Sequence, residues 1–164
     1  MTKNVKWIFV ALLTVPFIFF SFVGKDTPTE GLTIGDKAPS FKICGEKQLV
    51  DLKDLKGKYV LLSFWASYDA NSRMQNATLS HAASKSNKVE MVSVSFDNYK
   101  SIFKETIKKD RISTDNCFVE LNGENSEIYQ TYRLQKGFKN YLLDENGVIV
   151  AKDIKAKELS SYLN

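Results

Sequence analysis

The sequence contains few of the residues that most often carry catalysis or bind metals. Among 164 residues there are two cysteines, Cys44 and Cys117, and a single histidine, His81. The cysteines lie too far apart in the sequence to form a zinc or redox motif. One imidazole without neighbouring acids or thiols does not make a metal site. We therefore predict no metal site and no cofactor, and we expect His81 on the surface of a helix.

The sequence also lacks a strong excess of one charge. Its formal net charge is +4. Residues 1–24 hold Lys3 and Lys6 and no acid, so the charge without them is 4 − 2 = +2. Lysines elsewhere alternate with acids, as in residues 47–58. This pattern is typical of a solvated surface and excludes the basic patch that nucleic-acid binding requires, so we predict no nucleic-acid partner.

One long uncharged run lies near the N-terminus, at residues 7–23 (WIFVALLTVPFIFFSFV). As a helix it would cover roughly 26 Å, just short of a bilayer core. Lys3 and Lys6 precede it, so the positive-inside rule predicts an exported chain, periplasmic or on the outer face of the inner membrane. Both a cleaved signal peptide and an uncleaved membrane anchor fit residues 1–24. The expected membrane contact is limited to residues 7–23, if they are uncleaved.

The remainder divides into a linker and a folded domain. Residues 25–31 (KDTPTEG) have no apolar side chain and predict a linker, so the domain is expected over residues 32–164. Hydrophobic patterning predicts the following elements: strands 41–45, 48–52 and 59–65, helix 70–86, strand 89–96, helix 99–110, strand 117–121, helix 126–132, strands 140–144 and 148–153, and helix 155–163. This order predicts an α/β domain with a mixed central sheet, helices on both faces and an N-terminal β-hairpin extension.

Four segments, in this order, carry a resemblance to a known family: LTIGDKAPSF (32–41), LKDLKGKYVLLSFWAS (52–67), VEMVSVSFD (89–97) and YLLDENGVIVAKD (141–153). They resemble exported thioredoxin-fold proteins of the TlpA/ResA type and their AhpC/TSA relatives. The resemblance covers residues 32–164. It implies a thioredoxin-like fold. It also implies a site for thiol-disulfide exchange between the predicted strand at residues 59–65 and the helix that follows it.

The sequence departs from this family at the residues that carry its chemistry. Where the family has Cys-x-x-Cys, this chain has Asp69, Ala70, Asn71 and Ser72. A carboxylate and a hydroxyl cannot form the mixed disulfide through which a thiolate reacts. We therefore predict a degenerate, redox-inactive motif without a catalytic residue. Asp69 is expected to cap the helix that follows it.

Two other positions of the resemblance are also changed. Phe138 occupies the position of the family's cis-proline, and because a cis bond before a non-proline residue costs ~2.5–4 kcal/mol, we expect Gly137–Phe138 to be trans. Ser63 stands where cytosolic thioredoxins keep a buried acid. Three parts of the redox mechanism are therefore absent together.

The sequence thus favours a protein that acts by non-covalent binding of a peptide, protein or small ligand. The expected partner is an exported protein or peptide of unknown identity. The binding groove is predicted to be lined by residues on either side of the former redox motif: Tyr68, Asp69, Asn71, Ser72, Gly137, Phe138 and Lys139.

Three alternatives remain open. A thiol-disulfide oxidoreductase or peroxidase could use Cys44 or Cys117, although we expect both to be buried unreactive thiols and leave open whether they pair. Asp69 and Ser72 could catalyse a reaction without a thiol. The domain could also be a structural module of a larger envelope assembly.

Overall fold

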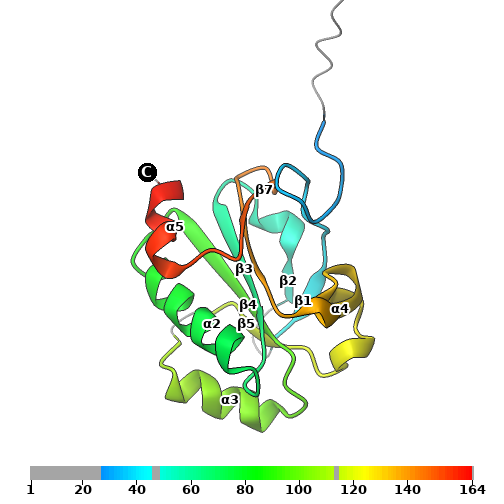
Figure 1. Ribbon diagram of the computed structural model, residues 1–164, viewed down its shortest axis with the longest axis vertical. Coiled ribbons are helices and arrows are strands. Elements are labelled where there is room, and N and C mark those ends of the chain that lie inside the picture. The colour runs from blue at the N-terminus through cyan, green and yellow to red at the C-terminus, as the bar shows by residue number, and fades with distance from the viewer. Residues whose placement is uncertain (1–26, 46–48, 113–114, 164) are drawn as a thin grey trace, which may run out of the picture.

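The computed structural model describes residues 27–45, 49–112 and 115–163 (Figure 1). The predicted signal peptide or anchor, residues 1–24, lies outside the described residues. Within the described ranges, no helix is both long and apolar enough to cross a membrane.

A five-stranded mixed sheet forms the centre of the domain, with the strand order β5-β4-β3-β6-β7. Its parallel strands are β3 (Tyr59–Trp65), β4 (Val89–Ser95) and β5 (Cys117–Val119), and its antiparallel strands are β6 (Asn140–Leu143) and β7 (Ile149–Lys152). The central strand β3 pairs with β4 through Ser63–Ser93 and with β6 through Ser63–Asn140. The predicted mixed α/β sheet is confirmed.

A separate two-stranded antiparallel sheet precedes the central one. It consists of β1 (Lys42–Cys44) and β2 (Leu49–Asp51), followed by the short 3₁₀ helix η1 (Leu52–Leu55). This pair confirms the predicted N-terminal hairpin extension. Its inward residues Ile43 and Val50 belong to the main core.

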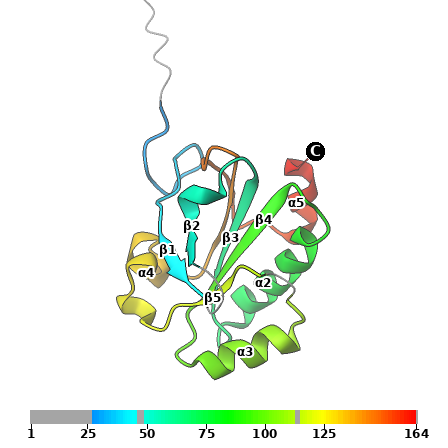
Figure 2. The ribbon, with the colours of Figure 1, turned by 180° about the vertical axis from the view of Figure 1, so that it is seen from behind.

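Helices cover both faces of the central sheet. Figures 1 and 2 show α2 (Ala70–Ala83) and α5 (Ala156–Tyr162) together on one face and α4 (Glu127–Thr131) with β1 and β2 on the other. Successive residues of β3 point to opposite faces, so Leu61 packs with the α2 and α5 side chains, whereas Leu62 and Phe64 pack with those of α4. The helix α3 (Lys100–Lys109) places Phe103 against Trp65, with ring centroids 6.2 Å apart.

The buried face of α2 differs from the predicted one. Apolar residues at turn spacing (Met74, Ala77 and Ala82 or Leu79) predict the inward face of this helix, but Met74 is 61% exposed. The inward face instead carries three polar residues, Ser72, Asn76 and Ser80, together with Leu79 and Ala83. The prediction was wrong because it followed apolar spacing alone, and polar residues supply most of this buried stripe.

The segment before β1 is hydrogen-bonded to the hairpin of β6 and β7. We call residues 29–39 the N-terminal arm. Gly35 N donates to Ile149 O at 2.9 Å, and Ile149 N donates to Asp36 O at 2.8 Å. Ala38 N donates to Gly147 O at 3.0 Å. The arm therefore lies along the edge of the sheet next to β7.

Candidate functional site

The turn between β3 and α2 holds the former redox positions. Asp69 adopts the extended backbone conformation of an N-cap residue, and its Oδ1 accepts a hydrogen bond from Ser72 N at 2.8 Å. The predicted capping role of Asp69 is confirmed. The carboxylate satisfies a backbone donor at the helix start, where negative charge is favoured. Asn71 and Ala70 lie exposed in the first turn of the helix.

Ser72 is directed into the turn. It is buried, its hydroxyl donates to Asp69 O at 3.2 Å, and its Oγ accepts from Ala66 N at 3.4 Å. These partners are backbone atoms, and none of them could remove the hydroxyl proton. Asp69 and Ser72 therefore hold the turn together at the two positions where the resemblance implied cysteines.

A buried acid that the sequence reasoning missed lies beneath the same turn. Asp97, two residues after the end of β4, is 2% exposed. Its Oδ1 accepts from Ser67 N at 2.8 Å and Ser67 Oγ at 2.6 Å, and its Oδ2 accepts from Ser95 Oγ at 2.7 Å. The sequence did offer a signal for it. An acid follows a strand of mostly apolar residues, and that strand ends at the same edge of the sheet as β3, where the turn begins. Its three donors balance the buried charge and fix the turn in place.

Phe138 faces the turn from the other side. No peptide bond among the described residues is cis, so the expectation for Gly137–Phe138 is confirmed. Gly137 has φ +110°, a conformation that side chains disfavour. The half-buried ring of Phe138 stacks on Phe96 at 5.8 Å and lies 6.3 Å from the ring of Tyr68. Tyr68 itself is 70% exposed. The structure thus brings together the two aromatic groove residues that the sequence predicted.

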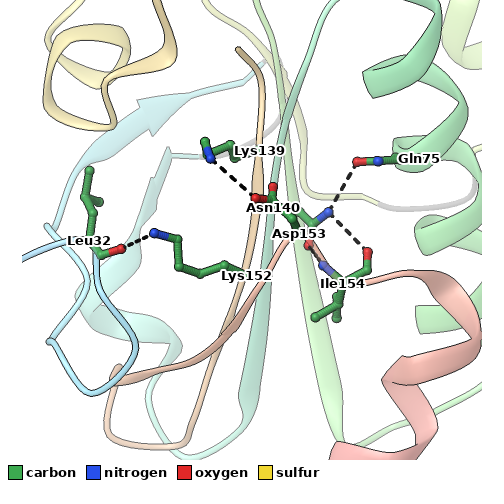
Figure 3. A network of polar contacts seen from close by, with 7 residues as sticks. All are labelled: Leu32, Gln75, Lys139, Asn140, Lys152, Asp153 and Ile154. Atoms are coloured by element: carbon green, nitrogen blue, oxygen red, sulfur yellow. Dashed lines mark hydrogen bonds and ion pairs between the residues drawn. The ribbon is translucent and has the colours of Figure 1, made fainter. Parts of the chain in front are cut away.

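Lys139 and Asn140 hold the segment that follows Phe138 in place. Lys139 Nζ lies 3.4 Å from Asp153 Oδ2 (Figure 3). The Asn140 amide accepts from Ile154 N at 2.9 Å and donates to Ile154 O at 3.3 Å and to Gln75 Oε1 at 3.5 Å. Asn140 therefore ties the start of β6 to α2 and to the segment before α5.

The surroundings of Tyr68 are acidic. Partial burial and the negative charges of Asp97, Glu124 and Asp69 raise the pKa of Tyr68. A raised pKa keeps its hydroxyl protonated at neutral pH. The exposed end of the Tyr68 side chain can therefore donate a hydrogen bond to a ligand.

The two cysteines lie outside this turn and are unpaired. The expectation that both are buried is wrong for Cys44, which is exposed. In β1 only the middle residue, Ile43, points inward, so its neighbours Lys42 and Cys44 face outward. Cys117 is half-buried at the start of β5, and burial raises the pKa of its thiol to about 12, an effect that the nearby Ser93 hydroxyl only partly opposes.

His81 lies on the exposed side of α2, as expected, with Nε2 3.2 Å from Asp110 O. A salt bridge near it joins α2 to the end of α3. Arg73 Nε and Nη2 contact the two carboxylate oxygens of Asp110 at 2.7 and 2.6 Å. This bidentate pair holds the N-terminal half of α2 against α3.

Comparisons with known proteins agree with this fold. A crystal structure of a thioredoxin-like protein from Parabacteroides distasonis is 40% identical, with a TM-score of 0.73, over 84% of this chain and 98% of that chain. A thiol-disulfide oxidoreductase from Bacteroides fragilis is 30% identical, with a TM-score of 0.66, over 78% of this chain and 97% of that one.

Sequence comparison gives the same relationship. The thiol-disulfide oxidoreductase ResA of Oceanobacillus iheyensis is 27% identical over 99% of this chain and 90% of its own length. The model of the AhpC/TSA family matches residues 34–152, which include the sheet, the β3–α2 turn and Phe138. The chain therefore belongs to the AhpC/TSA family, with a thioredoxin-like fold and similarity to ResA-type thiol-disulfide oxidoreductases.

Proposed function

We propose that this protein is a redox-inactive member of its family that binds an extended segment of an exported protein or peptide without forming a covalent bond. The observation that carries the proposal is the use of Asp69 and Ser72 within the turn. Their side chains cap and brace α2 at the two positions where thiol exchange needs sulfur. No mixed disulfide can form there.

The aromatic side chains beside the turn support a binding role. Tyr68 offers an exposed ring and a protonated hydroxyl, and Phe138 offers a ring held by Phe96 and Tyr129. Aromatic residues bury a large area at a small entropic cost, which makes them common anchors of interfaces. Backbone pairing of the ligand with residues 137–139 would add affinity.

We place this activity outside the cytoplasm. The uncharged run at residues 7–23 and the preceding Lys3 and Lys6 support export, and they fit either a cleaved signal or an anchor.

The exposure of Cys44 favours one alternative, a thiol-disulfide oxidoreductase that uses a cysteine outside the turn. Cys44 is accessible on β1, whereas the raised pKa of Cys117 keeps that residue a thiol at neutral pH. The alternative places the reactive sulfur on the small sheet. A disulfide-exchange assay of the Cys44→Ser variant distinguishes the two. The alternative expects the variant to lose activity, whereas the proposal expects it to behave like the native protein.

The binding proposal is tested by capture of partners from an extract of the source cell envelope. We expect the variant that combines Tyr68→Ala with Phe138→Ala to capture at least tenfold less of each partner than the native protein. The matched control removes two exposed tyrosines elsewhere, Tyr99 and Tyr162. Because Phe138 packs on Phe96, Tyr68→Glu alone serves as a second variant without a packing defect. Partners retained equally by all three variants would refute the groove assignment.

A further inference from the structure

A second cavity lies beside the groove, between the N-terminal arm and the sheet. Its volume is about 530 Å³, within the range of ligand pockets. The walls come from the arm, from residues 131–136 after α4, and from β6 and β7. Lys139 lines the cavity and also belongs to the predicted groove.

Basic residues outnumber acids around this cavity. Its lining includes the four bases Arg133, Lys136, Lys139 and Lys152 and the two acids Glu30 and Asp36. Asp36 is engaged within the arm, where it accepts hydrogen bonds from the backbone N–H and the hydroxyl of Thr33. The positive charges lie mainly on the wall opposite the arm, so an anion could contact them without displacing Asp36 from Thr33.

Two of the bases are already engaged with the protein. Lys152 Nζ donates to Leu32 O at 2.6 Å and lies 5.6 Å from the centre of the Tyr141 ring. Lys139 is paired with Asp153. Figure 3 shows Lys152 reaching across to the arm, so this lysine holds one side of the cavity in place.

The other two basic residues, Arg133 and Lys136, are not engaged in this way by other protein groups in the part of the chain that the structure describes. Arg133 and Lys136 are exposed, and within residues 27–45, 49–112 and 115–163 neither side chain has a hydrogen-bond or acid partner. They flank the 3₁₀ helix η3 (Leu134–Lys136), in which Lys136 N donates to Arg133 O at 3.2 Å. Arg133 is the N-cap residue of this helix and Lys136 its last residue, and both line the cavity.

The inner wall is apolar. Tyr132 and Tyr141 are each 1% exposed, and their ring centroids lie 5.5 Å apart. Leu32 and Pro39 of the arm line the same space. Because both tyrosines are almost fully covered, a ligand here would meet the two cations at the rim and, as the accessible apolar side chain, the half-buried Leu32.

We propose that this cavity binds a small organic anion, with its carboxylate at Arg133 and Lys136 and its apolar part against Leu32. An arginine fork can accept a carboxylate in a bidentate arrangement, and the lysine adds a second charge. The cavity shares only Lys139 with the predicted Tyr68–Phe138 groove, and binding of the anion does not depend on a ligand in that groove.

The test is a titration of the full-length, ¹⁵N-labelled protein in a non-ionic detergent, followed by NMR. The probes are 3-phenylpropanoate, its neutral amide 3-phenylpropanamide, and inorganic phosphate. We expect saturable binding of 3-phenylpropanoate, with shifts at the amides of Arg133, Lys136 and Tyr141, and at least tenfold weaker binding of the amide and of phosphate. Glu30→Gln should tighten binding of the carboxylate severalfold.

The variant Arg133→Gln with Lys136→Gln should weaken binding of 3-phenylpropanoate at least tenfold. Its matched control is Arg111→Gln with Lys108→Gln, because Arg111 also has a positive φ (52°, against 53° at Arg133) and its N–H likewise bonds a residue three positions away. The control should bind as native. Absence of saturable binding, equal binding of the amide or of phosphate, or an equal effect of the two double variants would overturn the proposal.

Discussion

The strand β3 and the turn that follows it are adjacent in the chain but are held by different forces. Six of the seven β3 residues are buried, and four of them divide between two apolar cores: Val60, Leu62 and Phe64 in one and Leu61 in the other. The turn is held by hydrogen bonds that the Asp69 and Asp97 carboxylates accept and that the Ser72 hydroxyl donates, and it exposes Tyr68. The strand therefore specifies the fold, whereas the turn specifies the chemistry. The structure of this turn therefore does not depend on sulfur at residues 69 and 72.

The largest difference should appear in stability. Leu62→Ala removes a fully buried side chain, and we expect it to lower the free energy of unfolding by about 2–5 kcal/mol. Tyr68→Ala in the turn should change it by no more than about 0.5 kcal/mol, because the side chain is mostly exposed. Urea denaturation of both variants measures these values. Equal losses would mean that the turn contributes to the fold as much as the strand does.

The two thiols should differ strongly in reactivity. Burial raises the pKa of Cys117 to about 12, so its thiolate is scarce at pH 8, whereas Cys44 is exposed. We expect Ellman's reagent to label Cys44 at least about a hundredfold faster than Cys117 in the folded protein. Cys44→Ser and Cys117→Ser assign the two phases. A fast phase that survives Cys44→Ser would show that Cys117 is reactive.

Removal of the helix cap should have a moderate effect. Asp69→Ala loses the hydrogen bond to Ser72 N, and we expect a loss of about 1 kcal/mol of unfolding free energy. Asp69→Asn keeps an acceptor and should retain most of the stability, which makes it the control. If alanine were as stable as aspartate in thermal and urea unfolding, the capping explanation for Asp69 would be incorrect.

The smallest effect concerns the salt bridge that joins α2 to α3. The hydrogen bonds from Arg73 hold the pKa of Asp110 below its usual value of 3.8. A lowered pKa stabilises the folded state above pH 3.8, and this contribution disappears as the pH falls through the lower folded-state value. Arg73→Gln should therefore lower the free energy of unfolding by about 0.5 kcal/mol at neutral pH, and by less in acid.

Unfolding of native protein and Arg73→Gln from pH 7 down to pH 2 measures this difference, with Arg111→Gln as the control for loss of a surface charge. A difference in stability that stays constant over the whole range would show that Asp110 is not the group involved.

Much of the fold could be predicted because its signals are local. A continuous apolar run marks β3, and the turn at Asn146-Gly147 marks the hairpin of β6 and β7. The inner face of α2 gave no such signal. There Ser93 Oγ accepts from Trp65 Nε1 and donates to Asn76 Oδ1, both at 2.8 Å. Hydrophobic spacing places polar residues outside, so it could not place Asn76 in the interior.

The candidate site could be predicted only in part. The changed residues of the turn and the position of Phe138 could be predicted because the family pattern specifies the positions of the Cys-x-x-Cys motif and of the cis-proline. Asp97 was not, since its role depends on contact with Ser67, thirty residues earlier in the chain. The basic cavity was equally hidden, because Lys152, Arg133 and Leu32 come together only through docking of the N-terminal arm.

The most direct test of redox inactivity is an insulin reduction assay with dithiothreitol, on the native protein and on Asp69→Cys combined with Ser72→Cys. We expect the native protein to show no rate above the reductant alone and the double variant to gain turnover, because the two substitutions place sulfurs at the start of α2, where a thiolate is stabilised. Turnover by the native protein, abolished by Cys44→Ser or Cys117→Ser, would contradict the account and assign the activity to that cysteine.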